Sequence, residues 1–168
     1  MAQKKQYKRF TPKQIKATLK RLKGERGTWE NHWQEVTDYI LPRKNTVLNS
    51  KSPGQKRTWQ LLDNIGVYCN ELLAGALQGM LTNPDLPWFE FTTGDIMLDQ
   101  QDDVAKWLQD SARRVLSVLN NSNFQTEVHE LYIDIGSIGT SLMQIEDDTD
   151  TVVRFSTKFI AEYFIKEN

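Results

Sequence analysis

Cysteine and histidine are scarce in this sequence, which limits the metal and redox chemistry open to it. The chain has one cysteine, Cys69, and two histidines, His32 and His129, on separate predicted helices. A single cysteine excludes an internal disulfide and fits a reducing compartment. Metal centres need several convergent Cys, His or carboxylate ligands, and this pattern does not provide them. We expect Cys69 to be a small buried side chain and both histidines to lie at a helix surface or an interface.

Long apolar runs are also missing. The most apolar candidate, residues 61–81, is interrupted by Asp63, Asn64, Asn70 and Glu71. No window therefore reaches the roughly 20 apolar residues that a membrane span needs. The first fourteen residues are strongly polar and do not resemble a signal peptide. We expect no membrane partner.

Motifs for catalysis and cofactor binding are absent as well. Gly75 and Gly79 are not followed by the Lys-Ser/Thr pair of a phosphate-binding loop. The acidic run 146–150 lacks the central Gly and distal Glu of a calcium loop, so we expect a solvated turn there. No Ser, His and Asp form a recognisable nucleophile motif. The sequence therefore predicts no enzyme, no metal site and no cofactor.

What the sequence does contain is an uneven distribution of charge. Residues 1–57 hold fifteen Lys/Arg and four Asp/Glu, whereas residues 58–168 hold six and eighteen, so a net charge of −1 hides a basic end and an acidic end. A basic segment of this kind suits contact with nucleic acid or with an acidic partner. Because the lysines are expected to be spread around a helix, the alternative is a solvated surface with no partner. The candidate contact residues are Lys4, Lys5, Lys8, Arg9, Lys13, Lys16, Lys20, Arg21 and Lys23.

The first predicted helix begins at a strong local signal. Residues 1–10 are expected to be a disordered basic arm, after which Thr11 and Gln14 form a capping box around a proline at the first helical position. Apolar residues then recur in steps of four and three up to Leu41-Pro42, and Arg26 occupies one position of this repeat. Gly24 and Gly27 could divide this helix in two. The seam residues are Ile15, Leu19, Leu22, Trp29, Trp33, Val36 and Ile40, and we expect both tryptophans to pack in the core.

The second predicted helix, residues 57–82, carries small residues among its apolar ones. Glycine in a helix interior costs roughly 1 kcal/mol relative to alanine, so Gly75 and Gly79 suggest that another backbone comes close there. Pro84 ends the helix, because proline forces its predecessor out of the helical region. The segment Trp88-Phe89-Glu90-Phe91 then reads as a short strand.

The remaining segments predict two more helices and a hairpin. A third helix fits residues 99–120, and Ser122 or Asn123 caps a fourth that ends at Gly136 and Gly139. Residues 141–146 and 151–155 alternate as half-buried strands around a turn at 147–150. We therefore expect an α+β fold that is mostly helical, with four main helices, a C-terminal β-hairpin and the short WFEF strand. Apolar residues at 159–165 suggest that a following element is missing.

Four of these patterns, taken in order, resemble the head-to-tail connector (portal) proteins of T7-like short-tailed bacteriophages. They lie at residues 21–42, 72–89, 104–124 and 136–142, and together they cover nearly the whole chain. One departure is Asp63-Asn64-Ile65, where family members often carry Asp-Ser-Thr. The quoted residues include Arg21, Arg26, Trp29, Trp33, Pro42, Leu72, Gly75, Gly79, Pro84, Trp88, Trp107, Phe124, Gly136 and Gly139.

The resemblance implies a structural virion protein and not an enzyme. It implies that residues 11–168 form the N-terminal, wing-like region of a longer portal protein, which forms a twelve-fold ring at one capsid vertex for DNA packaging, DNA ejection and tail attachment. The implied partners are further copies of the chain, capsid, scaffolding, tail or adaptor and terminase proteins, and the double-stranded DNA that passes through the ring. The implied location is the virion, and the host cytoplasm during assembly. The expected packing anchors are Trp29, Trp33, Leu77, Trp88, Trp107 and Phe124.

Two other functions fit parts of the sequence. The chain could be a small helical DNA-binding or regulatory protein that uses its basic N-terminal arm, with Tyr7 and Phe10 placed to stack on bases. It could also be a coiled-coil adaptor built on the seam from Ile15 to Ile40.

Overall fold

The computed structural model describes residues 10–44, 46–48, 52, 54–56, 58 and 61–166, so the basic arm before Phe10 lies outside the described residues. Within this part of the chain the fold is mostly helical with one antiparallel hairpin, as the sequence predicts. The elements are α1 (Pro12–Tyr39), η1 (Pro42–Lys44), α2 (Ile65–Leu81), α3 (Ile96–Asp99), α4 (Asp102–Asn121), α5 (Phe124–Ile138), β1 (Leu142–Asp148), β2 (Val152–Lys158) and η2 (Ile160–Glu162).

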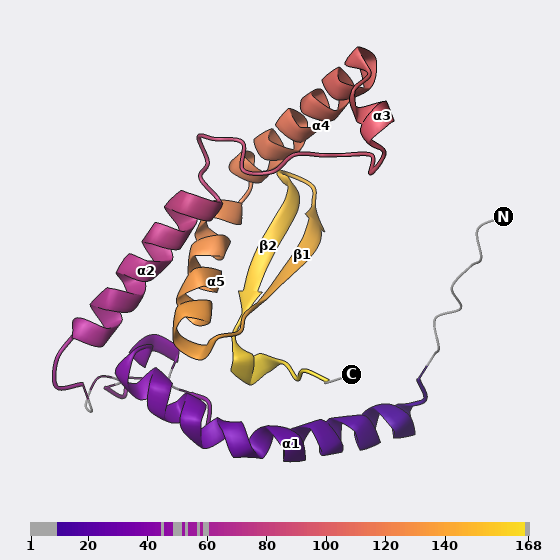
Figure 1. Ribbon diagram of the computed structural model, residues 1–168. Helices are drawn as coiled ribbons and strands as arrows, with labels where there is room; N and C mark the ends of the chain where they lie inside the picture. Colours follow the sequence, from indigo (N-terminus) through magenta and orange to yellow (C-terminus); the bar gives the residue numbers. More distant parts are fainter. Residues whose placement is uncertain are drawn as a thin grey trace.

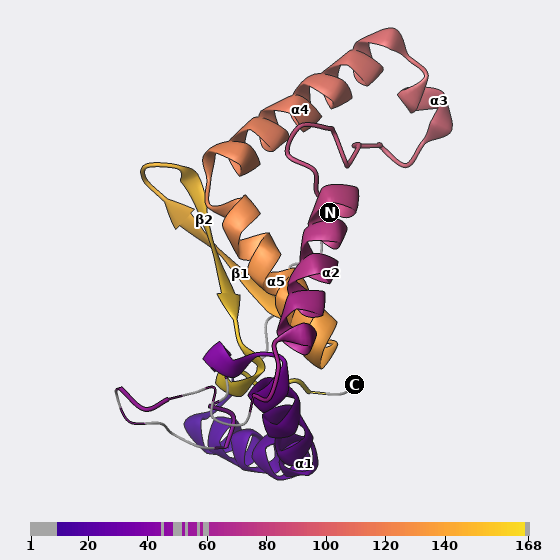
Figure 2. The ribbon, with the colours of Figure 1, turned by 90° about the vertical axis from the view of Figure 1, so that its left-hand side faces the viewer.

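The body of the molecule is a layer of two helices against the hairpin. Helices α2 and α5 run side by side, and α5 lies between α2 and the two strands (Figures 1 and 2). Helix α1 crosses one end of this body, and α4 extends from the other end. The core lies around α5, where buried side chains come from α2, α5, β2 and η2. Its members include Ala74, Phe124, Val128, Tyr132, Ile133, Phe155, Phe159 and Ile160.

Helix α1 begins as predicted and runs without a break. The Thr11 side chain accepts a hydrogen bond from the Gln14 backbone N–H, and the Thr11 backbone N–H donates in return to the Gln14 side chain. Gly24 and Gly27 lie inside a continuous helix, so they do not divide it. The helix spans residues 12–39, and only its C-terminal half lies against the body of the molecule (Figure 1).

Helix α2 packs through a different face from the one that its sequence suggests. Asn70 and Ala74 are buried, whereas Gly75 and Gly79 have nothing within 4 Å of an added Cβ. Within this chain the two glycines therefore do not mark a close approach, and the approach of another copy to this side of α2 stays a prediction. The close approach lies instead at Gly136 of α5, where a Cβ would overlap the Asn70 side chain. Asn70 Nδ2 also donates to the Ile133 carbonyl at 3.1 Å, and this polar contact turns α2 away from its most apolar side.

The start of α2 and the break before α4 also differ from prediction. Helix α2 begins at Ile65 and not at residue 57, because the Asp63 carboxylate accepts the Ile65 amide proton at 3.0 Å and forms a local turn. The helix expected at 99–120 corresponds to α4, which begins at Asp102, and the short α3 that precedes it was not predicted; the non-helical Gln100-Gln101 separates the two.

Helix α5 explains why the WFEF segment forms no strand in the described structure. The side-chain amide of Asn123 exchanges two 2.8 Å hydrogen bonds with the Phe155 backbone, and Glu127 accepts the Thr157 amide proton at 2.6 Å. These contacts satisfy the outer edge of β2, so no position remains there for a third strand. Residues 88–91 are extended but lie outside any sheet, which contradicts the predicted strand.

The hairpin and the end of α5 follow the predicted order with longer strands. Gly139 ends α5 at φ 81°, a left-handed conformation that favours glycine, whereas Gly136 remains inside the helix. The strands pair in antiparallel register from Leu142↔Lys158 to Asp148↔Val152. The turn is shorter than expected because the Asp148 carboxylate accepts hydrogen bonds from the backbone and hydroxyl of Thr151.

Candidate functional site

Arg26 joins α1 to the C-terminal segment. Its side chain is 9% exposed, and Nη1 donates hydrogen bonds to the carbonyl oxygens of Ala161 and Tyr163 at 3.3 and 3.2 Å. Nε lies 3.0 Å from Glu30 Oε1, and the guanidinium stands 4.9 Å from the ring centre of Phe164. Arg26 interrupts the apolar seam in the sequence, but in the structure it is a buried side chain that links α1 to the C-terminal segment. Its partners lie 135 and 137 residues away, so no local pattern identifies them.

A partly buried charge cluster ties η1 to α5. Lys44 Nζ lies 2.7 Å from Asp134 Oδ1 and 3.0 Å from Glu130 Oε2, and Asp134 is almost fully buried. Burial opposes the charge on Lys44, but the hydrogen bonds and charges of the two carboxylates outweigh it and raise the Lys44 pKa. Burial raises the pKa of Asp134, against the hydrogen bond and charge of Lys44. The cluster fixes the end of α1 on the core, and the sequence analysis missed it.

The described basic residues line one side of the exposed half of α1. At roughly 100° per residue, Lys13, Lys16, Lys20 and Lys23 fall within an arc of about 80°. The expectation that the lysines are spread around the helix was therefore wrong for these four. Arg21 lies apart from them and pairs with Glu25 at 2.9 Å. The candidate residues Lys4, Lys5, Lys8 and Arg9 lie outside the described residues.

The expected packing anchors occupy two kinds of environment. Trp33, Leu77 and Trp88 are partly buried against the core, and Phe124 belongs to it. Trp88 stacks on Phe124 with ring centres 6.0 Å apart. Trp29 and Trp107 are 58% and 66% exposed, so Trp29 does not pack in the core as expected. The role of these two tryptophans as packing anchors stays a prediction.

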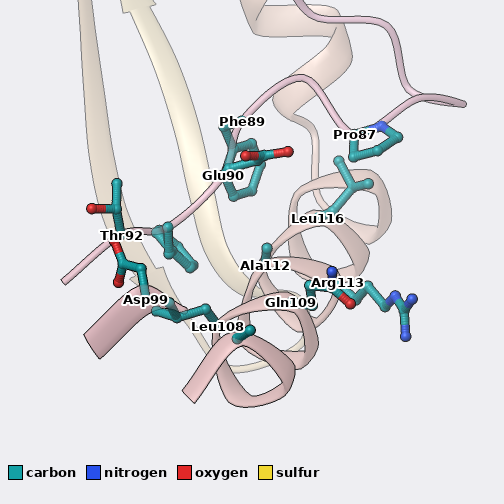
Figure 3. Close-up of a pocket in the computed structure, with 12 residues that line it drawn as sticks. Pro87, Phe89, Glu90, Thr92, Asp99, Leu108, Gln109, Ala112, Arg113 and Leu116 are labelled. Atoms are coloured by element: carbon teal, nitrogen blue, oxygen red, sulfur yellow. The ribbon is translucent and has the colours of Figure 1, made fainter. Parts of the chain in front are cut away.

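A groove lies between α4 and the extended segment before α3. Its volume is about 480 Å³, and Figure 3 shows side chains from both elements facing it. Apolar groups of Phe89, Leu108, Ala112 and Leu116 form much of its surface. The acidic side chains of Glu90 and Asp99 also line it. Hydrogen bonds from Thr93 lower the pKa of Asp99, so this carboxylate is charged at neutral pH. The sequence analysis did not identify this groove, because it depends on how two separate segments pack.

The scarce cysteine and histidines differ in their surroundings. Cys69 is exposed, contrary to the expected burial, because α2 turns its Asn70 and Ala74 side inward. His32 is exposed, while His129 lies 2.9 Å from Gln78 Oε1. Among the described residues, no group of three or more His, Cys, Asp or Glu side chains is arranged to hold a metal ion. In the same part of the chain, no helix has the length and apolar character that a membrane crossing requires.

Comparisons with known proteins place the chain in a family. The family model described as bacteriophage head to tail connecting protein matches residues 12–168. A probable portal protein of Bordetella phage BPP-1 is 34% identical over 145 residues, which cover 86% of this chain and 26% of that protein. The portal protein of Salmonella phage epsilon15 is 30% identical over 148 residues, which cover 88% of this chain and 27% of that protein. The chain thus spans about a quarter of the length of these relatives. Because the family model covers every described helix and strand, the chain belongs to the bacteriophage head-to-tail connecting protein family.

Proposed function

We propose that residues 11–168 form the N-terminal, wing-like region of the portal subunit of a T7-like short-tailed bacteriophage. In this proposal the subunit is structural, and copies of it assemble into a twelve-fold ring at one capsid vertex. The match of the family model to residues 12–168 carries the proposal. The exposure of large apolar side chains on α1, α2 and α4 supports it, because a subunit of an assembly keeps such surfaces for its neighbours.

The ring accounts for the proposed partners. Double-stranded DNA passes through it during packaging and ejection, and its two ends bind capsid, scaffolding, tail or adaptor and terminase proteins. The proposed location is the virion, with the host cytoplasm during assembly. Electron microscopy of the purified full-length gene product is expected to reveal rings with a central hole. A full-length protein that remains a stable monomer under all conditions tested would contradict the proposal.

A second candidate function is DNA binding through α1. The observation in its favour is the row of Lys13, Lys16, Lys20 and Lys23 on one side of an exposed helix. Titration of the chain against duplex DNA at several salt concentrations separates the two functions. A steep salt dependence that disappears when residues 1–23 are deleted would favour DNA binding, whereas weak binding that is unaffected by the deletion would exclude it.

A further inference from the structure

The apolar seam of α1 continues beyond the body of the molecule. Trp33 and Ile40, near its C-terminal end, pack against the core. Ile15 and Leu19, near its N-terminal end, are 55% and 48% exposed. In Figure 1 this first half of α1 extends past the hairpin and the C-terminal segment. The exposed half therefore presents the apolar side chains of Ile15 and Leu19, whereas Leu22, at the i+7 position, is half-buried beside the C-terminal segment.

The charge on this half of α1 is all of one sign. Residues 12–23 contain five Lys/Arg and no Asp/Glu. The row formed by Lys13, Lys16, Lys20 and Lys23 lies about 120° around the helix from the apolar seam, which follows from roughly 100° per residue. This half of α1 is thus an amphipathic helix with a basic flank, and it lacks a covering element among the described residues.

The groove on α4 has the complementary character. Its surface is largely apolar and comes from α4 and residues 87–92, as Figure 3 shows. Residues 87–116, which span its lining residues, contain six carboxylates and three Lys/Arg, a net charge of −3. Arg113 is a cation among the lining residues, and it lies 3.5 Å from Asp110. The groove therefore suits a basic amphipathic helix.

The first half of α1 does not reach the groove of its own chain. Figures 1 and 2 both place α1 at one end of the molecule and α4 at the other, with α2 and α5 between them. A basic apolar helix and an acidic apolar groove thus lie on opposite ends of one molecule. Two such surfaces on one molecule make a head-to-tail contact, which closes into a ring when the rotation between copies allows it.

We propose that the first half of α1 of one copy docks in the α4 groove of the next copy. This inference rests on the proposed ring, and it specifies which surfaces meet in it. Ile15 and Leu19 enter the groove as the anchors of a helix-in-groove contact. Lys16 and Lys20 face the carboxylates around it and set the orientation of the pair.

Two other arrangements could cover the first half of α1 or the α4 groove, and each predicts a result different from that of the docking contact. Duplex DNA would engage the lysines but would leave both the apolar seam and the groove uncovered. A further segment of the polypeptide could cover the groove within one subunit, and α1 of a neighbour would then be unable to enter it. Either arrangement predicts no proximity between α1 of one copy and the groove of another.

Cysteine cross-linking between copies tests this proximity. The natural Cys69 is replaced by Ser, one variant carries Leu19→Cys, and a co-expressed variant with a tag of different size carries one cysteine on α4. Oxidation is expected to join the two variants when the α4 cysteine faces the groove, but not when it lies on the opposite side of the same helix. The groove positions are Ala105→Cys, Gln109→Cys and Ala112→Cys, and the matched control is Arg114→Cys.

Electron microscopy of the same samples separates the possible failures. Rings without a mixed disulfide at any groove position would overturn the docking contact and leave the proposed function standing. Equal cross-linking at groove and control positions would overturn the docking contact as well. The absence of any assembly of the full-length protein with its natural Leu19 would overturn both. Adding Lys16→Glu and Lys20→Glu to the Leu19→Cys variant is expected to reduce the yield of the mixed disulfide severalfold.

Discussion

At the scale of single residues, Arg26 shows how a buried side chain can connect distant parts of this fold. We expect Arg26→Lys to destabilise the chain by about 2 kcal/mol, because the single nitrogen of lysine cannot replace both Nη1, which bonds two carbonyls, and Nε, which pairs with Glu30. Urea denaturation measures this change. The control is Arg21→Lys, whose pair with Glu25 is exposed and is expected to alter the stability by less than about 1 kcal/mol. Equal effects of both substitutions would contradict the role of Arg26 in linking α1 to the C-terminal segment.

Lys44 is expected to be essential for the partly buried charge cluster. Lys44→Met leaves Asp134 buried without its cation, and we expect a loss of about 3–5 kcal/mol in unfolding free energy. The double variant Lys44→Met, Asp134→Leu removes both charges and is expected to recover most of this loss. A double-mutant cycle in urea measures the coupling. Additive losses would show that the pair contributes no interaction of its own.

The raised pKa of Lys44 also predicts a pH dependence. The ion pair stabilises the fold fully below the ordinary pKa of 10.5, and this contribution is lost as the pH rises through the higher folded-state pKa. The free energy of unfolding is therefore expected to fall above pH 10.5. Lys44→Arg, which keeps its charge, should show a smaller fall in this range. Parallel pH profiles for the two proteins would contradict the assignment to Lys44.

At the scale of elements, the glycines of α2 and α5 have opposite roles. Gly79 has open space around it, so Gly79→Ala is expected to stabilise the chain by up to about 1 kcal/mol through helix propensity. A Cβ at Gly136 overlaps the Asn70 side chain, so Gly136→Ala is expected to cost about 1–2 kcal/mol despite the same gain in propensity. Thermal unfolding of the two variants measures whether each substitution stabilises or destabilises the chain. Stabilisation by Gly136→Ala would contradict the close approach of α2 and α5.

The same elements explain which parts of the fold the sequence predicts. Local signals succeed: the Thr11 capping box starts α1, and Gly139 ends α5. Predictions fail where a distant side chain decides the outcome. Asn70 bonds to α5 and turns the apolar side of α2 outward, and Asn123 occupies the β2 edge that a WFEF strand would need. The α4 groove could not be predicted either, because its two walls are separated by a loop whose path depends on packing.

At the scale of the whole molecule, charge and apolar exposure are arranged along one direction. The basic half of α1 lies at one end, and the acidic α3–α4 region lies at the other (Figure 1). Between them the exposed side of α2 carries large apolar side chains, among them Leu72 and Met80. If these ends meet between copies, self-association is expected to weaken as salt rises from about 0.1 to 1 M, since the screening length falls from about 10 to 3 Å. The fold itself should be far less sensitive, because its main ion pair is buried.

Light scattering at several salt concentrations measures this dependence, and charge variants at the two ends test its origin. Lys20→Glu removes positive charge from the α1 end and is expected to flatten the salt dependence. Lys106→Glu adds negative charge to the opposite end and is expected to steepen it. Opposite effects from two identical Lys→Glu changes cannot come from net charge alone, because both make the protein more acidic by the same amount. The same direction of change in both variants would show that the two ends do not face each other in the assembly.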